Sequence, residues 1–137
     1  MAALSDKIPN SNKRAEGEYF EQAACDYLVS QGYKIVERNF RFRRLGEIDI
    51  IAADGEYLCF IEVKARSTQA FGSPVEAVVE SKRRRIRKLA EIYLAKSADP
   101  ALNIRFDLAL IEFFKGISSD SSAYNTVKDI KLIKNAF

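Results

Sequence analysis

The chain has 137 residues, of which 47% are hydrophobic and 30% are charged, and its formal net charge is +3. This composition is typical of one globular domain and excludes a disordered chain. Because the sequence contains no histidine, it also excludes Ser-His-Asp and Cys-His catalysis and histidine-bound zinc. No apolar run approaches the roughly 20 residues of a membrane span, so we expect a cytoplasmic protein with no membrane partner.

The first part of the chain is predicted to form a leader and one helix. Residues 1–14 are polar and show no periodicity, which predicts a flexible leader ahead of a single domain over residues 15–137. From residue 15 to residue 31 the apolar side chains recur at helical spacing, and Gly32 is well placed to end that helix.

Two glutamates of this helix are candidates for a functional site. At 100° per residue, Glu21 falls beside Ala24 and Leu28 at the edge of the apolar stripe, whereas Glu18 falls further toward solvent. Glu21 is therefore the better candidate for an active-site carboxylate. The alternative for either residue is a solvated glutamate on a helix surface.

The stretch from Gly46 to Lys64 carries the strongest signal in the sequence. Two apolar runs, 48–53 and 57–63, are separated at Asp54-Gly55, which predicts an antiparallel hairpin. The runs are apolar on both faces, which indicates strands that are covered on both sides.

Three charged residues, Asp49, Glu62 and Lys64, interrupt this hairpin. Glu62 and Lys64 share one face of their strand while Val63 points into the core, and Asp49 can lie opposite or diagonal to that pair. Carboxylate oxygens suit a hard cation such as Mg²⁺, and a metal-bound water has a lowered pKa. Lys64 is placed to position that water or to neutralise a phosphate. The pattern predicts a metal-dependent phosphodiesterase site, with a surface salt bridge as the alternative.

Basic and polar side chains on either side of the hairpin are candidates for binding a nucleic acid. They are Arg41, Arg43, Arg44, Arg66, Gln69, Lys82, Arg84, Arg85 and Lys88. The last four belong to the start of a helix predicted over residues 81–96, where positive charge opposes the helix dipole. Phosphate binding would explain that arrangement, and merely solvated charges are the alternative. Because aromatic residues do not alternate with the basic ones at this helix start, base stacking by the helix is not indicated.

The remaining elements complete the predicted fold. An edge strand is expected over 33–40, and a short helix is expected to begin at 73–76. A strand over 104–110, a loop over 115–125 and a last strand over 127–133 should follow. Cysteines at positions 25 and 59 are expected to be small core residues. The order of helix, three strands, helix and two strands predicts an α/β sandwich with a central mixed β-sheet flanked by helices.

Asp49 followed by Glu62-Val63-Lys64 resembles the D-(spacer)-(D/E)-x-K signature of PD-(D/E)xK nucleases, although Ile48 stands where that signature usually has proline. Further motifs strengthen the resemblance, and these are Gly32-Tyr33, Arg38-Asn39-Phe40, Gly46-Glu47-Ile48-Asp49, Phe60 to Arg66, Phe71-Gly72, Arg105-Phe106-Asp107 and Asn135-Ala136-Phe137. From about Glu18 to Phe137 the chain resembles the YraN-type bacterial proteins, which are assigned as endonucleases by similarity and are distantly similar to Holliday junction resolvases.

The resemblance implies a restriction-endonuclease-like fold and a Mg²⁺ or Mn²⁺ cofactor. In this reading Asp49, Glu62 and the carbonyl of Val63 are metal ligands. Glu21 and Lys64 join Asp49 and Glu62 as catalytic residues, although Phe20 stands where the YraN-type pattern usually has glycine before that glutamate.

Two functions from different classes follow. One is a metal-dependent endonuclease that hydrolyses DNA phosphodiester bonds, on branched or structured DNA by resemblance. The other is a nucleic-acid-binding module that keeps the nuclease fold without cutting. A structural protein whose hairpin charges form only a salt bridge is a third interpretation. The sequence leaves open the number of metals and whether the protein forms a homodimer.

Overall fold

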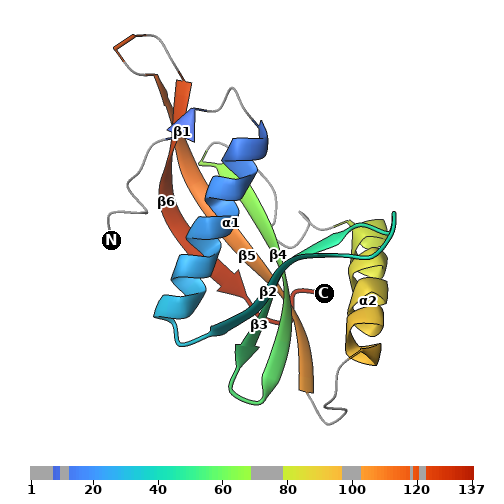
Figure 1. Ribbon diagram of the computed structural model, residues 1–137. Coiled ribbons are helices and arrows are strands. Elements are labelled where there is room, and N and C mark those ends of the chain that lie inside the picture. The colour runs from blue at the N-terminus through green and yellow to red at the C-terminus, as the bar shows by residue number, and fades with distance from the viewer. Residues whose placement is uncertain (1–7, 10–12, 69–78, 97–102, 118, 121–122) are drawn as a thin grey trace.

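A six-stranded mixed sheet carries the fold, and two helices flank it from different sides (Figure 1). The computed structural model describes residues 8–9, 13–68, 79–96, 103–117, 119–120 and 123–137. The described elements, in chain order, are β1 (Ile8–Pro9), α1 (Lys13–Ser30), β2 (Lys34–Arg41), β3 (Glu47–Asp54), β4 (Tyr57–Ser67), α2 (Glu80–Ala95), β5 (Asn103–Ile117) and β6 (Ala123–Ile133). The structure confirms the predicted α/β sandwich.

The strands follow the order β1-β6-β5-β4-β3-β2 across the sheet. Only β4 and β5 run parallel, and every other neighbouring pair is antiparallel. A parallel pair needs a long crossover connection, and α2 lies in the segment between these two strands. The β2 strand occupies one edge of the sheet, as its weak apolar pattern predicts.

Two hydrophobic cores lie on opposite faces of the sheet. Leu28 of α1 packs in one core with Ile61, and Leu89 of α2 packs in the other with Phe60. Phe60 and Ile61 are neighbours on β4 and are both fully buried, because adjacent strand residues point to opposite faces. The hairpin is therefore covered on both sides, as predicted. Cys25 is buried in the same core as Leu28, as is Cys59.

Two glycines shape the turns around the hairpin and α1. Gly32 has a φ of +91° directly after α1, and Tyr33 donates a hydrogen bond to the Leu28 carbonyl at 2.9 Å, which satisfies the end of the helix. Gly55 has a φ of +58° in the two-residue turn between Asp54 and Tyr57, which face each other across the hairpin.

Three strands extend beyond the predicted limits. The strand predicted from the apolar run 57–63 continues in β4 through Ser67, because its backbone pairs with β5 as far as Phe113. The loop predicted over 115–125 is shorter, since β5 continues to Ile117 and pairs there with β6. Long-range pairing extends these strands into polar sequence that gives no strand signal of its own.

The predicted leader also differs from the structure. Ile8 and Pro9 pair with β6 within the segment expected to be flexible, and α1 begins at Lys13 rather than Ala15. The short helix predicted from residue 73 and the side chain of Gln69 lie outside the described residues. Neither described helix is long and apolar enough to cross a membrane.

Candidate functional site

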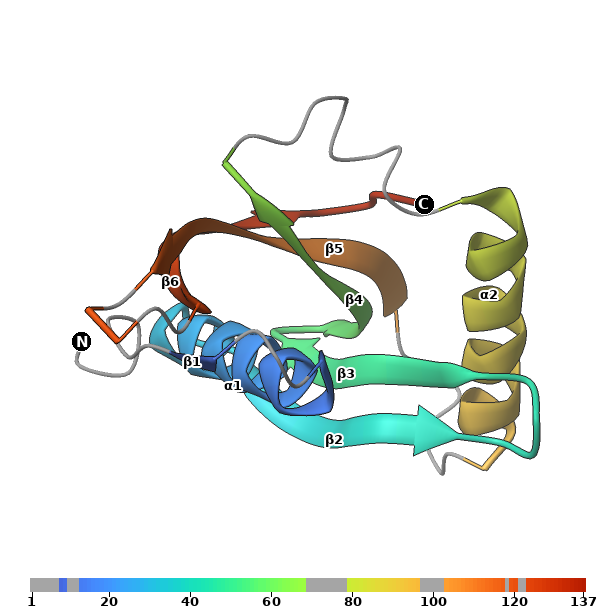
Figure 2. The same ribbon diagram turned by 90° about the horizontal axis from the view of Figure 1, so that it is seen from above.

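The sheet opens between β3 and β4. Pairing between β3 and β4 starts at Asp54 and Tyr57 and ends at Ile50 and Ile61. Beyond that point β3 continues beside β2, and β4 continues beside β5 as far as Ser67. Figure 2 shows β4 leaving β3 and crossing toward β5. We call this gap the fork, which is bounded by residues 47–49 of β3 and 62–65 of β4.

Asp49 stands where the two strands separate. Ile48 and Ile50 would share a face in a regular strand, yet they pack in different cores, so β3 turns at Asp49. The Oδ2 atom of Asp49 accepts a hydrogen bond of 2.9 Å from the Val63 backbone N–H. This bond holds the Asp49 carboxylate across the fork against β4.

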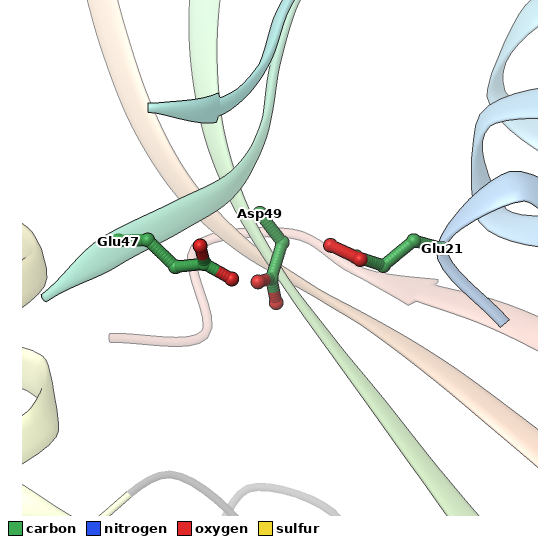
Figure 3. A group of neighbouring side chains, drawn as sticks. All are labelled: Glu21, Glu47 and Asp49. Carbon is green, nitrogen blue, oxygen red and sulfur yellow. The ribbon is translucent and has the colours of Figure 1, made fainter. Parts of the chain in front are cut away.

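Carboxylates from three elements meet at the fork. Oxygen atoms of Glu21 from α1 and of Glu47 and Asp49 from β3 lie within 4.8 Å of one another (Figure 3). Glu62 of β4 is 4% exposed and lines the same hollows as Glu47 and Asp49. One hollow, of about 240 Å³, faces α2, and the other, of about 280 Å³, faces α1. The fork is therefore open toward both helices.

The crowding of these acids changes their proton affinity. Burial, together with the charge of Glu62, raises the pKa of Asp49 to about 8, although the hydrogen bond from Val63 opposes the rise. Burial also raises the pKa of Glu21, and the nearby Glu47 carboxylate adds to the rise. The Oε1 atom of Glu21 is buried without a hydrogen-bond partner among the described residues. Both carboxylates would be stabilised by added positive charge.

Two cations of the chain already contact the fork. The Lys82 Nζ atom, from the first turns of α2, forms an ion pair with Glu62 Oε1. On the other side, Arg41 Nε contacts Glu47 Oε2 at 2.7 Å. Arg85 joins Lys82 in lining the hollow that faces α2. These cations balance only part of the negative charge.

The structure brings Glu21, Asp49, Glu62 and Val63 together, as the sequence predicts for the catalytic and metal-binding residues. Glu18 is instead exposed and forms an ion pair with Arg14, so Glu21 is the helix glutamate that reaches the fork.

The position of Lys64 differs from the expectation that it shares the site with Glu62. Its side chain is exposed, and it lines neither of the two hollows of the fork. The lysine that contacts Glu62 is Lys82, which the sequence placed among phosphate-binding residues.

The other predicted nucleic-acid-binding residues fall into separate places. Arg43 lies over the Phe42 ring, with 5.1 Å between its Cζ atom and the ring centroid, and Arg44 is exposed in the same loop. Arg66 is partly buried and contacts Glu112 of β5 at 3.9 Å.

On α2, two of the predicted cations, Arg84 and Lys88, lie on the exposed side of the helix. Arg84 contacts Glu80 at 3.8 Å, and Lys88 contacts Glu91 at 3.6 Å. Arg85, together with Lys82, faces the fork.

Glu47 is the site residue that sequence reasoning missed. It begins β3 and lies two residues before Asp49, so the two side chains share a face at the period of a strand. That spacing could have identified it, had the strand been predicted to begin one residue earlier than Ile48.

A mixed sheet has helices on both faces, and acidic side chains gather at the gap between β3 and β4. These features define the class of the protein, an α/β sandwich with an acidic fork. The chain belongs to the family described as "Uncharacterised protein family UPF0102", whose sequence model matches residues 20–111. This is the YraN-type family, so the predicted resemblance is confirmed. The matched segment contains Glu21, Glu47, Asp49 and Glu62.

Several relatives carry the same family name. The UPF0102 protein of Acetivibrio thermocellus is 47% identical over 135 residues, covering 98% of this chain and 100% of the relative. That of Clostridium kluyveri is 46% identical over 121 residues, covering 88% of this chain and 92% of the relative. That of Symbiobacterium thermophilum is 48% identical over 99 residues, covering 72% of this chain and 83% of the relative.

Proposed function

We propose that the protein is a Mg²⁺- or Mn²⁺-dependent endonuclease that hydrolyses phosphodiester bonds in branched or otherwise structured DNA. The observation that carries this proposal is the fork itself, where four carboxylates line two adjoining hollows and two cations of α2 stand beside them. Such a surplus of acid is costly unless a cation is bound, because like charges that are close and partly buried repel each other.

The residues of the fork fit a hard divalent cation. Oxygens of Glu21, Glu47 and Asp49 lie within 4.8 Å of one another, and Glu21 Oε1 is a buried acceptor with no partner among the described residues. Oxygen donors of this kind are the usual ligands of Mg²⁺ and Mn²⁺. Glu62 and the Val63 carbonyl are the further ligands we propose. A bound ion would act as a Lewis acid on the phosphate and would make water a stronger acid.

The chain's own residues would do the rest of the work. The Val63 N–H fixes Asp49 in one orientation before substrate arrives, so little reorganisation is needed. Glu21 Oε1 would either complete the cation site or accept a hydrogen bond from the attacking water. Lys82 and Arg85 would stabilise negative charge on the phosphate, and Lys64, which is exposed, would approach the nucleophile from outside the fork.

DNA is the proposed substrate because the cations near the fork suit a phosphate backbone. Lysine and arginine contacts to phosphates position a nucleic acid without reading its sequence. Preference for branched DNA rests on the resemblance to Holliday junction resolvases, and it agrees with the lack of aromatic residues among the cations at the start of α2.

A cleavage panel tests the proposal. Linear, nicked, flapped and four-way DNA would be incubated with the protein and Mg²⁺, Mn²⁺ or a chelator. We expect metal-dependent cleavage of at least one structured substrate, loss of cleavage in Asp49→Asn, and retention in Glu18→Gln, which removes an exposed carboxylate from the same helix as Glu21. Binding without cleavage of any substrate would contradict the enzyme and favour the non-catalytic binding module.

A further inference from the structure

We propose that Arg38, together with Asn39, binds a phosphate of the cleaved DNA strand next to the phosphate that is cut, on the side of the fork that faces α1. This inference rests on the proposed function and assigns to the substrate a contact on the side opposite to Lys82 and Arg85. Arg38-Asn39 belongs to one of the motifs that carry the family resemblance, and the candidate site does not otherwise include it.

The first observation is the place of the two side chains. Arg38 and Asn39 line an open hollow of about 650 Å³ between α1 and β2, which Glu21 also lines. Glu21 is a wall of the α1-facing hollow of the fork as well. The two hollows therefore adjoin at Glu21, and a strand that crosses the fork would continue from one into the other.

The second observation is the backbone of Asn39. Consecutive residues of a strand normally point to opposite faces of the sheet, so Arg38 and Asn39 would not be expected to line one hollow. Asn39, however, has a φ of +54°, in the left-handed region that asparagine adopts more readily than most other residues. This conformation lets both polar side chains face the same space.

The third observation is an unused hydrogen-bond donor. Arg38 Nη1 donates to Gln22 Oε1 at 2.8 Å, and Gln22 Nε2 donates in turn to Asp26 Oδ1 at 2.9 Å. The guanidinium is thus held by a neutral amide, and no ion pair of Arg38 is found among the described residues. Its Nε atom is buried without a partner among the described residues, and its positive charge lies near enough to Glu21 to lower the pKa of that carboxyl. A planar guanidinium with an unused N–H donor and no ion pair within the described chain suits a phosphate oxygen.

Electrostatics supply the reason for this contact. A polyanion is repelled by the carboxylates of the fork, so cations are needed on both sides of it. Lys82 and Arg85 stand on the α2 side, and Arg38 is the arginine that lines a hollow beside Glu21 on the α1 side. A strand held at both sides would place the intervening phosphate over the acids.

The experiment is a thermodynamic cycle between the protein and single phosphates of the DNA. Catalysis is blocked by Asp49→Asn, and affinity is measured for a four-way junction in which one phosphate at a time is replaced by an uncharged methylphosphonate. At one position near the cut, we expect the replacement to weaken binding about tenfold in the protein that keeps Arg38. In the protein that carries Arg38→Gln, the same replacement should not weaken binding. Arg38→Gln should also lower the slope of log affinity against log salt by about 0.9.

Two variants make the test specific. Lys34→Gln removes one exposed positive charge from the same strand, and it should leave the methylphosphonate pattern unchanged. If thermal unfolding shows that Arg38→Gln does not fold, Arg38→Lys, which keeps the charge and loses the Nε donor, replaces it and should reduce the effect at the same position.

The outcomes separate this proposal from the proposed function. Equal methylphosphonate effects in Arg38 and its variants, in a protein that binds the junction, would overturn the role of Arg38 alone. No binding of any DNA by the Asp49→Asn protein or by its parent would overturn the proposed function, and the role of Arg38 with it.

Discussion

Two clusters of charged residues lie at opposite ends of the β3–β4 hairpin, and they differ in how completely their charges are paired. Near the hairpin turn, Arg105 of β5 is 6% exposed and Asp107 is fully buried. Arg105 Nε donates to both oxygens of Asp107 at 3.0 and 2.9 Å, and its Nη2 donates to Tyr33 Oη at 2.9 Å and to Asp54 Oδ2 at 3.2 Å. We call this set the Arg105 cluster.

The Arg105 cluster ties distant parts of the chain together. It joins β5, the hairpin end and the residue that precedes β2, and the Asn135 N–H adds a hydrogen bond of 3.0 Å to Asp107 Oδ1. Each buried charge faces an opposite charge and has hydrogen bonds, which is the condition under which a buried ion pair is tolerated. Burial raises the pKa of Tyr33 to about 12, so its hydroxyl stays neutral.

At the fork the same kinds of residue are left out of balance. Carboxylates of Glu21, Glu47, Asp49 and Glu62 share the space, and the ion pairs of the described residues there come only from Arg41 and Lys82. The comparison shows that one charged residue in a covered strand does not by itself indicate a role in function. The balance of charge within its cluster does. A cluster with matched partners holds the fold, whereas a cluster with a surplus of one sign is arranged for something that the fold does not supply.

The largest effect should come from removing one acid of the fork. Asp49→Asn is expected to lower the rate of metal-dependent DNA cleavage by about 10⁴-fold or more, because it removes a ligand charge while preserving shape. Without metal the variant should be as stable as the parent or more stable, since one repelling carboxylate is gone. Gel-based cleavage and chemical unfolding measure the two effects.

Glu56→Gln, in the exposed hairpin turn, is the matched control and should cut at the parent rate. If the Asp49→Asn variant kept its cleavage activity, the surplus of carboxylates at the fork would have no role in catalysis.

Breaking the Arg105 cluster should affect stability instead of chemistry. Arg105→Met leaves Asp107 buried and unpaired, which should lower the free energy of unfolding by about 3 to 5 kcal/mol. Urea unfolding measures it. Arg14→Met removes an arginine whose side chain is 92% exposed in its pair with Glu18, and it should change stability by less than about 0.5 kcal/mol. Similar losses in the two variants would show that the Arg105 cluster is not a structural clamp.

The pH dependence of stability should report the imbalance of the fork directly. The pKa of Asp49 rises from 3.8 to about 8, so between these values the folded protein holds a proton that the unfolded chain has released. In metal-free buffer the free energy of unfolding should therefore fall as pH rises from about 4 to about 8, and this contribution should be level above pH 8.

Unfolding of the parent and of Asp49→Asn across this range isolates the contribution of one group. The difference in stability between the two proteins should widen with pH in favour of the variant. A difference that stays constant from pH 4 to pH 8 would mean that Asp49 is ionised throughout.

Lys64 and Lys82 allow a finer test of the fork, because Lys64 is exposed and Lys82 contacts Glu62. Lys64→Ala should slow cleavage by about 10²-fold while leaving metal affinity equal or higher, as expected for a group that acts on the nucleophile or phosphate. Single-turnover cleavage and calorimetry with Mn²⁺ separate the two quantities. Lys82→Met is the comparator, because Lys82 contacts Glu62 and competes with a metal for it. It should raise metal affinity, and a collapse of affinity in Lys64→Ala instead would make that residue structural.

The smallest effect concerns the cations of α2. Arg85 lines the fork, whereas Arg84 contacts Glu80 on the exposed side of the helix. In the Asp49→Asn background, Arg85→Ala should lower the salt slope of DNA binding by about 0.9, and Arg84→Ala should lower it by less than about half of that. Binding to two unrelated duplexes and one four-way junction over a salt series gives the slopes. Equal reductions of the slope in the two variants would mean that the DNA-binding surface also includes the exposed side of α2.

The sequence alone was sufficient for the local elements and for half of the fork. Two apolar runs and the Asp54-Gly55 turn predict the hairpin, and helical spacing predicts the buried face of α1. The carboxylates of Asp49 and Glu62 stand out because they interrupt apolar strands. These features depend on neighbours in the chain, so they can be read from spacing. The same reasoning separates Glu21 from Glu18, because the two side chains lie about 60° apart around the helix axis and Glu21 is the one nearer the core.

Tertiary structure decided which charges meet. Arg105 and Asp107 were visible as a charged face of a strand, yet only the parallel pairing of β4 with β5 and the return of Asn135 give them partners. Lys82 reaches Glu62 because α2 begins beside the fork. The fork itself exists because β3 and β4 stop pairing beyond Ile50 and Ile61, while β3 stays paired with β2 and β4 stays paired with β5. Contacts between segments that are far apart in sequence depend on packing of the whole chain, and no local pattern records them.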